Sequence, residues 1–191
     1  MFIHQTSFVD KGAKIGEGTK IWHHSQISEG AQIGQNCVIG HNCFIASKAK
    51  LGKGVKLESN IDVWDLVTLE DYVFVGPSAV FTNDLNPRAK YPKSKFPECG
   101  KWLPTLVKEG ASIGANATIV CGNTIGKWAM IGAGAVVTKN IPDYALAVGI
   151  PAKIIGWFCE CGNKLEFQPE KAICQICSRK YEKKGEVVRE I

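Results

Sequence analysis

The sequence lacks long hydrophobic runs and is poor in histidine. Of 191 residues only four are histidine, and all four lie within the first 41 positions. No stretch of about 18 consecutive apolar residues occurs, and residues 1–12 do not place a basic segment before an apolar one. We therefore expect no transmembrane helix and no secretory leader. We predict that the protein is cytoplasmic and does not bind membranes.

Strong charge of one sign is also missing. Lys and Arg number 23 against 18 Asp and Glu, which gives a formal net charge of +5. Because the lysines are spread along the chain rather than clustered, we interpret them as solvated surface and expect no nucleic-acid partner. The eight cysteines, in a chain without a secretory leader, indicate reduced thiols or metal ligands rather than disulfides.

What the sequence does have is a period of six. An aliphatic residue or Phe stands at every sixth position from Ile3 to Phe81, and the same period resumes from Val107 to Val137. Six fits neither a helix nor simple strand alternation, so each hexad must be one short strand and a turn. The pattern predicts an all-β fold, a parallel β-helix. The position four after each aliphatic residue is mostly small, as a narrow interior requires, and Cys37 and Cys43 occupy it as packed thiols.

The period is interrupted once. The separation between Phe81 and Val107 is not a multiple of six. We therefore expect a loop over residues 82–106, inserted into a β-helix domain of residues 1–156. The loop holds five Lys or Arg against two acidic residues. Long irregular insertions in a strict repeat are more often functional than decorative. Residues 141–153 leave the period again and are expected to close the open end of the solenoid.

Residues 157–191 form a separate tail with two close cysteine pairs. These are Cys159 and Cys161, then Cys174 and Cys177. So short a segment cannot bury enough core to fold alone, and four thiolates suit tetrahedral zinc, so we predict a structural zinc ribbon. The first pair has one intervening residue where two are commoner, and Ser178 follows the second pair where Gly is usual. A tail that keeps its cysteines without metal is the alternative.

Several motifs together resemble a known family. They are Ile-Trp-His at 21–23, Leu-Glu-Asp at 69–71, Val-Phe-Thr-Asn at 80–83, Asn-Pro-Arg at 86–88, Pro-Thr-Leu-Val at 104–107 and Gly-Ala-Ser-Ile-Gly-Ala-Asn at 110–116. Over about residues 1–157 the chain resembles the hexapeptide-repeat nucleotide-sugar N-acetyltransferases, and among them the UDP-2-acetamido-3-amino-2,3-dideoxy-D-glucuronate N-acetyltransferases of surface polysaccharide and lipopolysaccharide biosynthesis. The resemblance implies a left-handed β-helix in which three hexads make one coil. It also implies a homotrimer with active sites between neighbouring helices.

The resemblance further implies site residues. Asn83 is expected near the reacting amine. The expected contacts to the nucleotide-linked amino sugar are Trp22, His23, Trp64, Asp65, Thr82, Asp84 and Arg88. The expected contacts to acetyl-CoA are Ala115, Ala133, Lys139, Pro151 and Lys153. A step of three hexads puts Asn83 over Asp65 and His41 over His23, and it aligns Ala115, Ala133 and Pro151 in one column of small residues. Such a column suits either an extended ligand or simply a turn.

The histidine distribution bears on the chemistry. Hexapeptide O-acetyltransferases use a His base because a sugar hydroxyl is a poor nucleophile, and a positioned base contributes about 10²–10⁴-fold. An amine with a pKa near 8 is about a tenth neutral at pH 7 and can forgo that base. Because neither the loop nor the later coils contain His, N-acetylation is favoured over a sugar or serine O-acetyltransferase.

Other functions are still open from the sequence. A dTDP-3-amino-3,6-dideoxyhexose N-acetyltransferase differs only in the acceptor. A zinc-dependent hydratase on the same fold would need three close His ligands, and only His23 and His41 align. A non-catalytic trimeric scaffold would show no acetyl-CoA binding.

Overall fold

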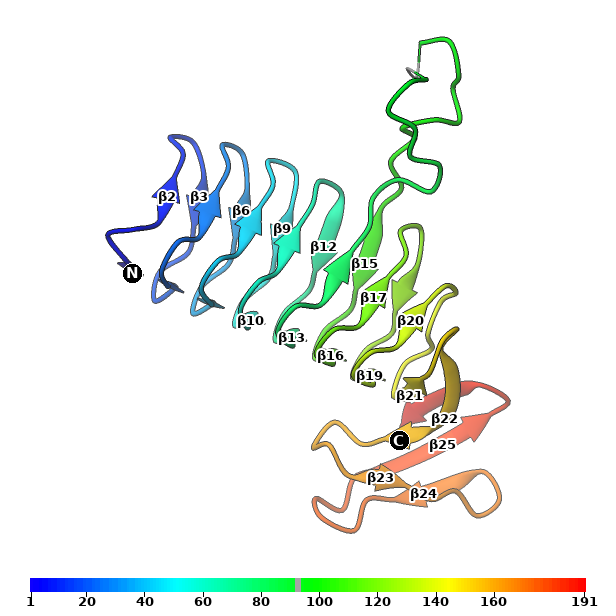
Figure 1. Cartoon of the computed structure of the whole chain (residues 1–191). Helices are drawn as coiled ribbons and strands as arrows, with labels where there is room; N and C mark the ends of the chain where they lie inside the picture. The colour runs from blue at the N-terminus through cyan, green and yellow to red at the C-terminus, as the bar shows by residue number, and fades with distance from the viewer. Residues whose placement is uncertain (92–93) are drawn as a thin grey trace.

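The short hexad strands stack into a solenoid with a triangular cross-section. The computed structural model describes residues 1–91 and 94–191, so Pro92 and Lys93 of the inserted loop lie outside the described residues. Figure 1 shows the coils side by side, with the loop projecting from one edge and the tail at the far end. No helix occurs among the described residues, and hence none that is long and apolar enough to cross a membrane.

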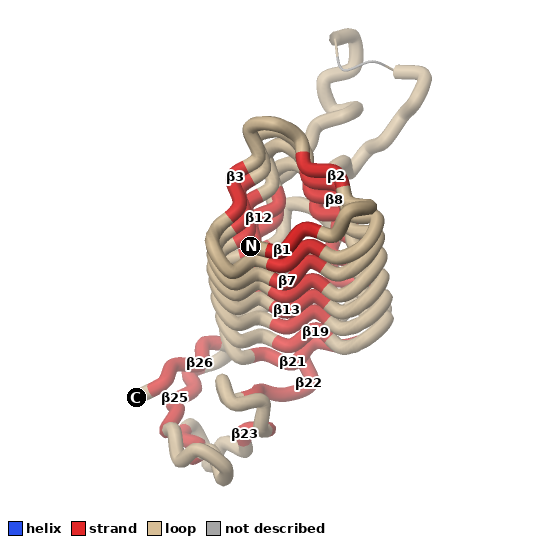
Figure 2. Tube along the Cα trace, turned by 90° about the vertical axis from the view of Figure 1, so that its left-hand side faces the viewer, coloured by secondary structure: helices blue, strands red, loops and turns tan. Residues whose placement is uncertain are grey.

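Three faces of parallel strands make up the prism (Figure 2). The first face consists of β1 (Phe2–Ile3), β4 (Lys20–Ile21), β7 (Val38–Ile39), β10 (Lys56–Leu57), β13 (Phe74–Val75), β16 (Ser112–Ile113), β19 (Met130–Ile131) and β21 (Ala145–Val148). The second consists of β2 (Phe8–Val9), β5 (Gln26–Ile27), β8 (Phe44–Ile45), β11 (Asp62–Val63), β14 (Val80–Phe81), β17 (Thr118–Ile119) and β20 (Val136–Val137). The third consists of β3 (Lys14–Ile15), β6 (Gln32–Ile33), β9 (Lys50–Leu51), β12 (Val67–Leu69), β15 (Thr105–Val107) and β18 (Thr124–Ile125).

The register confirms the predicted coil. Ile21 pairs with Ile39 and Ile39 with Leu57, so each coil advances the chain by three hexads. Val75 pairs with Ile113 across the loop, so the whole insertion is accommodated within a single coil and the stacking resumes in register beyond it. The prediction of an all-β, left-handed parallel β-helix is confirmed.

The last coil departs from the expected step. Ile131 pairs with Ala147, which lies short of three full hexads further on, so the register aligns Gly149 with Ala133. The expected alignment of Pro151 with Ala115 and Ala133 is therefore wrong. The step is short because the turn after β20 is shorter than a hexad turn: Val137 still pairs with Ile119 at the full step, but Ile141, only four residues later, already bridges Ile125.

From Ile21 onward the periodic aliphatic residues fill the interior, where Ile21, Ile39 and Leu57 are at most 1% exposed, whereas Ile3 at the open N-terminal end is 37% exposed. Burial of one such side chain contributes about 1.5–3 kcal/mol. The small interior column carries hydrogen bonds from coil to coil: the Thr19 hydroxyl donates to the Gly34 carbonyl (2.9 Å), and the Cys37 thiol to the Gly52 carbonyl (3.1 Å). Cys37 and Cys43 are buried as predicted. Desolvation raises the pKa of the Cys43 thiol to about 11, so this thiol is unreactive at neutral pH.

Glycine after a strand permits close stacking at a corner. A Cβ added to Gly114 would lie 2.5 Å from the Ala133 nitrogen, and one added to Gly34 would lie 2.5 Å from the Gly52 carbonyl. Real Cβ atoms essentially never come this close to backbone atoms. Glycine is therefore needed at these positions for the space it leaves.

The tail continues the first face of the solenoid. Strand β22 (Lys153–Phe158) runs antiparallel to β21, and β23 (Lys164–Leu165) pairs with β22. A second small sheet contains β24 (Lys171–Ile173), β25 (Lys180–Lys184) and β26 (Val187–Glu190), all antiparallel. The two sheets lie against the final coil, so the open end of the solenoid is covered (Figure 1).

Candidate functional site

A cleft beside the inserted loop contains the expected catalytic position. Its volume is about 350 Å³, and it is lined by Ser28, Phe44, Ala46, Ser47, Trp64, Asp65, Asn83 and Trp102. Trp64 is 37% exposed and Trp102 48% exposed. Two exposed indole rings next to an amide and a carboxylate form a surface that a flat ring and a sugar could both contact.

The cleft lies where one face of the solenoid is interrupted. Strands β11 and β14 occupy equivalent hexads of successive coils, yet β11 pairs only with β8 and β14 only with β17. Over the described residues, the first and third faces have no such break. The strand pairing of this face is therefore interrupted between the coil of Trp64 and Asp65 and the coil of Asn83, from which the loop departs.

Asn83 anchors the loop through its backbone and leaves its side chain at the cleft. The Asn83 carbonyl accepts a hydrogen bond from the Leu103 N–H (2.9 Å), and Asp84 bridges to Trp102 in antiparallel fashion. The two ends of the loop are thus joined at its base, and this pairing brings Trp102 next to Asn83. Among the described residues, none forms a hydrogen bond with the Asn83 side-chain amide, whereas neighbouring polar side chains are engaged.

Two of the expected sugar contacts also stabilise the corner. The Asp65 carboxylate accepts from the Lys48 N–H (2.7 Å), and the Thr82 hydroxyl accepts from the Cys121 N–H (3.0 Å). Each of these side chains therefore satisfies a backbone donor in a neighbouring coil. Partial burial raises the pKa of Asp62, which lies on β11 shortly before Trp64.

Asp84 lies at the base of the loop, where it bridges Trp102, and Arg88 lies further along the loop. Arg88 is exposed, and its guanidinium donates to the Pro87 carbonyl (2.8 Å). The Asp84 carboxylate accepts from the Asn86 N–H (2.9 Å). Neither residue lines the cleft within a single chain.

Trp22 and His23 lie at a different corner of the prism. They follow the first face, whereas Asp65 and Asn83 follow the second. A separate cleft of about 330 Å³ contains both, together with His41, Lys56, Glu58 and neighbouring residues. His23 stacks on His4 with ring centroids 3.7 Å apart, and desolvation, followed by the charges of His23 and His24, lowers the pKa of His4. The cluster offers no set of three converging imidazoles among the described residues in which a metal could be held.

The expected acetyl-CoA contacts divide between the same two corners. Ala115 and Ala133 share the column of His23, whereas Lys139 continues the column of Asp65, Asn83 and Cys121. Ala133 is exposed, and Gly134 has no atom within 4 Å of a Cβ built on it. The column of small residues is therefore open enough for an extended ligand. Pro151 and Lys153 are exposed on the turn and strand that follow β21.

Trp102 and Phe44 line the cleft but are not among the site residues expected from the sequence. Phe44 lies in an ordinary hexad, where its ring contacts Trp64 at a centroid distance of 5.4 Å. Trp102 lies in the aperiodic loop, so no repeat arithmetic could locate it. The available signal was an aromatic residue directly before the chain returns to the repeat at Leu103-Pro104.

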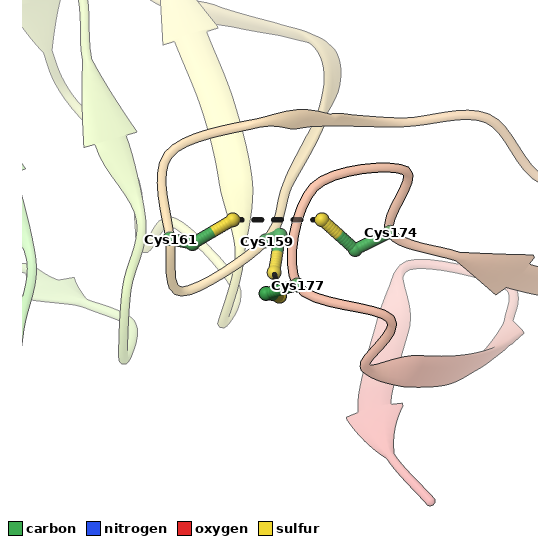
Figure 3. Close-up of side chains that lie close together, drawn as sticks. All are labelled: Cys159, Cys161, Cys174 and Cys177. Atoms are coloured by element: carbon green, nitrogen blue, oxygen red, sulfur yellow. Dashed lines mark hydrogen bonds between the residues drawn. The ribbon is translucent and has the colours of Figure 1, made fainter.

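The four tail cysteines converge (Figure 3). Their sulfur atoms all lie within 4.8 Å of one another. The structure therefore brings together the four residues that the spacing predicted as metal ligands.

Comparisons with known proteins agree with this architecture. Residues 12–47 match the family described as bacterial transferase hexapeptide (six repeats), and residues 104–139 match the hexapeptide repeat of succinyl-transferase. The dTDP-3-amino-3,6-dideoxy-alpha-D-galactopyranose 3-N-acetyltransferase of Aneurinibacillus thermoaerophilus is 54% identical over 87 residues, 46% of this chain and 45% of that protein. Serine acetyltransferase of Escherichia coli is 32% identical over 107 residues, 56% of this chain and 36% of that protein. The chain thus matches less than half the length of these relatives.

Two solved structures share the fold. A variant of the GDP-perosamine N-acetyltransferase of Caulobacter crescentus, in complex with CoA and GDP-perosamine, is 24% identical with a TM-score of 0.59, covering 75% of this chain and 58% of that one. The acetyltransferase domain of PglB from Neisseria gonorrhoeae, in complex with acetyl coenzyme A, is 24% identical with a TM-score of 0.50, covering 80% and 56%. These two structures confirm the fold, and the relative that is 54% identical over 87 residues confirms the resemblance to hexapeptide-repeat nucleotide-sugar N-acetyltransferases.

Proposed function

From a chain that carries the hexapeptide repeats of bacterial transferases, we propose an acetyl-CoA-dependent N-acetyltransferase that acts on the amino group of a nucleotide-linked amino sugar. The observation that carries the proposal is the cleft of Trp64, Asp65, Asn83 and Trp102 at the base of the loop. The relative that is 54% identical over 87 residues acetylates a sugar of this chemical class. The whole-chain activity is inferred, since the matched segment is less than half of either protein.

The cleft suits an amine acceptor better than a hydroxyl. It contains no histidine, and the four histidines of the sequence lie at positions 4, 23, 24 and 41, in the first coils. We propose that the neutral amine attacks the thioester carbonyl of acetyl-CoA directly. The C–N bond forms, the C–S bond breaks, and the departing CoA sulfur takes the amine proton. Asn83, whose amide is free of partners among the described residues, donates to the carbonyl oxygen as negative charge develops there.

The nucleotide-sugar chemistry fits the cleft and loop. The exposed rings of Trp64 and Trp102 give stacking surfaces for the base or sugar. Arg88 and the loop lysines provide positive charge for the diphosphate or for a sugar carboxylate. We propose two acceptors of this kind. The sequence motifs suggest UDP-2-acetamido-3-amino-2,3-dideoxyglucuronate, and the relative from A. thermoaerophilus favours a dTDP-3-amino-3,6-dideoxyhexose.

A homotrimer would unite the expected site residues. Within one chain, Trp22, His23, Ala115 and Ala133 lie at one corner and Asn83 and Lys139 at the next. A site that uses all of them requires two copies of the chain, each presenting a different corner. Light scattering on the purified full chain should give three times the monomer mass; a monomer that retains full turnover would contradict this assembly.

Nucleotide sugars and acetyl-CoA are cytoplasmic metabolites, so we place the reaction in the cytoplasm, in the supply of sugars for surface polysaccharide such as lipopolysaccharide. Zinc in the tail would be structural, because four thiolates leave no open coordination position.

A panel of acceptors tests the function. The full chain is incubated with acetyl-CoA and either the UDP-linked uronate amine or the dTDP-linked 3-aminohexose, and the products are identified by mass spectrometry. We expect one acetyl group on the amine of one of the two sugars. Acetylation of neither, with acetyl-CoA binding intact, would contradict the acceptor class. Absence of acetyl-CoA binding would contradict the proposed acetyltransferase activity and favour a non-catalytic scaffold.

A further inference from the structure

The four tail sulfurs have the spacing of a closed tetrahedral metal site. Zn–S bonds of about 2.3 Å place sulfurs about 3.8 Å apart. Cys159 and Cys177 are 3.4 Å apart, Cys161 and Cys174 are 3.5 Å apart, and all four lie within 4.8 Å (Figure 3). A disulfide would need about 2.05 Å. The geometry is close to that of metal thiolates and far from that of disulfides.

Two similar turns hold the cysteine pairs. The Gly162 N–H donates to the Cys159 carbonyl (2.8 Å), and the Ser178 N–H donates to the Cys174 carbonyl (2.9 Å). Gly162 and Ser178 have left-handed φ values of 85° and 62°. The two departures from the usual ribbon spacing, a shorter first pair and Ser178 in place of Gly, therefore leave the paired-turn geometry intact.

A buried tyrosine supports the site from outside. Tyr181 is fully buried, and its hydroxyl lies 3.1 Å from the Cys159 sulfur. A phenol in this position donates to a thiolate and orients it, the role that outer-shell partners commonly have at metal sites. Arg179 bridges Glu160 (3.4 Å) in the first turn and Glu190 (3.2 Å) in β26, so both halves of the tail converge at this point.

The same tyrosine connects the cluster to the solenoid. Its ring packs edge-on against Tyr144 of the last coil, with centroids 5.2 Å apart at 69°, and the Phe158 N–H donates to the Tyr144 carbonyl (2.8 Å). Strand β22, which covers β21, ends at Phe158, directly before Cys159. The first cysteine of the cluster therefore follows directly after β22, the strand that caps the last coil.

We propose that Cys159, Cys161, Cys174 and Cys177 bind one Zn²⁺ and that this ion clamps the cap on the last coil, with Tyr181 as the positioning residue for Cys159. The tail has few other means of holding its shape. Its fully apolar buried side chains are few, Leu165, Ala172 and Val188 among them, and so small a core seldom folds unaided. Free energy of metal binding therefore becomes free energy of folding for the cap. The proposal concerns structure and stands whether or not the chain transfers acetyl groups.

Metal analysis of the full chain is the first test. We expect one zinc per chain by elemental analysis and a loss of it in Cys174→Ser, with Cys99→Ser in the loop as the matched control that keeps zinc. After removal of the metal, added Co²⁺ should give the sulfur-to-cobalt charge-transfer absorption of a tetrahedral thiolate site. A chain that purifies without metal and binds neither Zn²⁺ nor Co²⁺ would overturn the proposal, and stoichiometric iron in place of zinc would overturn the identity of the ion.

The clamp and the role of Tyr181 need separate readouts. Tyr181→Phe keeps the ring packed on Tyr144 and removes only the hydroxyl, so we expect folding to persist while zinc affinity, measured by chelator competition, falls about 10–100-fold. Unchanged affinity would remove Tyr181 from the site. In hydrogen exchange of the metal-free full chain, amides of 153–158 should exchange faster than in the zinc form, while those of 38–57 are unchanged. Equal exchange of 153–158 in both forms would contradict the clamp.

Discussion

Replacement of Asn83 by Ala tests whether its amide takes part in the reaction. The Asn83 carbonyl, not the side chain, fixes Leu103, so the substitution leaves the base of the loop intact. It removes a donor that no described residue engages, at the edge of a cleft of about 350 Å³. Loss of one donor to a developing oxyanion typically lowers kcat about 10²–10³-fold, or about 2.7–4 kcal/mol. We expect that loss in kcat with little change in KM.

The assay is release of CoA thiol under saturating acceptor and acetyl-CoA. Asn83→Asp is the companion variant, since it keeps the size and removes the donor, and it should be as impaired as Asn83→Ala. Gln168→Ala, which removes an exposed amide from the tail, controls for nonspecific effects. A rise in KM with kcat unchanged would refute the reasoning and make Asn83 a binding residue only.

Three further predictions follow. Trp102→Ala should raise the KM for the nucleotide sugar about 2- to 10-fold with kcat nearly constant, since loss of one aromatic contact is worth about 0.5–1.5 kcal/mol; a normal KM would exclude Trp102 from the site. Gly114→Ala should lower the free energy of unfolding by about 1–3 kcal/mol in thermal melts, because its Cβ would lie 2.5 Å from the Ala133 nitrogen. The control Gly156→Ala, with no atom within 4 Å of its Cβ, should melt as the wild type, and equal melting of both variants would contradict the stacking argument. Since burial raises the pKa of Cys43 to about 11, its thiol is almost fully protonated at about pH 8, and iodoacetamide at that pH should label it only after denaturation; rapid labelling of Cys43 in the folded protein would contradict this.

The solenoid was predictable because its signal is periodic. Each aliphatic residue from Ile21 to Val137 reports the same physical fact, a side chain pointing into a narrow interior, and the errors of single positions average out. The small residues Cys37 and Cys43 could be placed inside for the same reason. The four cysteines of the tail cluster could be grouped from the sequence because two close pairs are the spacing that a tetrahedral metal site requires.

The site was less accessible, since it depends on where the period fails. Trp102 enters the cleft only because Asp84 and Trp102 pair at the base of the loop. Both residues lie in the aperiodic loop, so the hexad period could not predict that pairing. Pro151 was misplaced since the last coil is shorter than the three full hexads of the coils before it. Trp22 and Asn83 lie at different corners, so only a neighbouring chain could bring them to one site.

In the proposed reaction, an amine on a nucleotide sugar accepts the acetyl group without a histidine base. The most direct measurement is release of CoA thiol by the full chain offered UDP-2-acetamido-3-amino-2,3-dideoxyglucuronate or a dTDP-3-amino-3,6-dideoxyhexose, each beside its 3-hydroxy counterpart. We predict turnover with an amine and none with either hydroxyl sugar. Comparable turnover of a hydroxyl acceptor would contradict the claim.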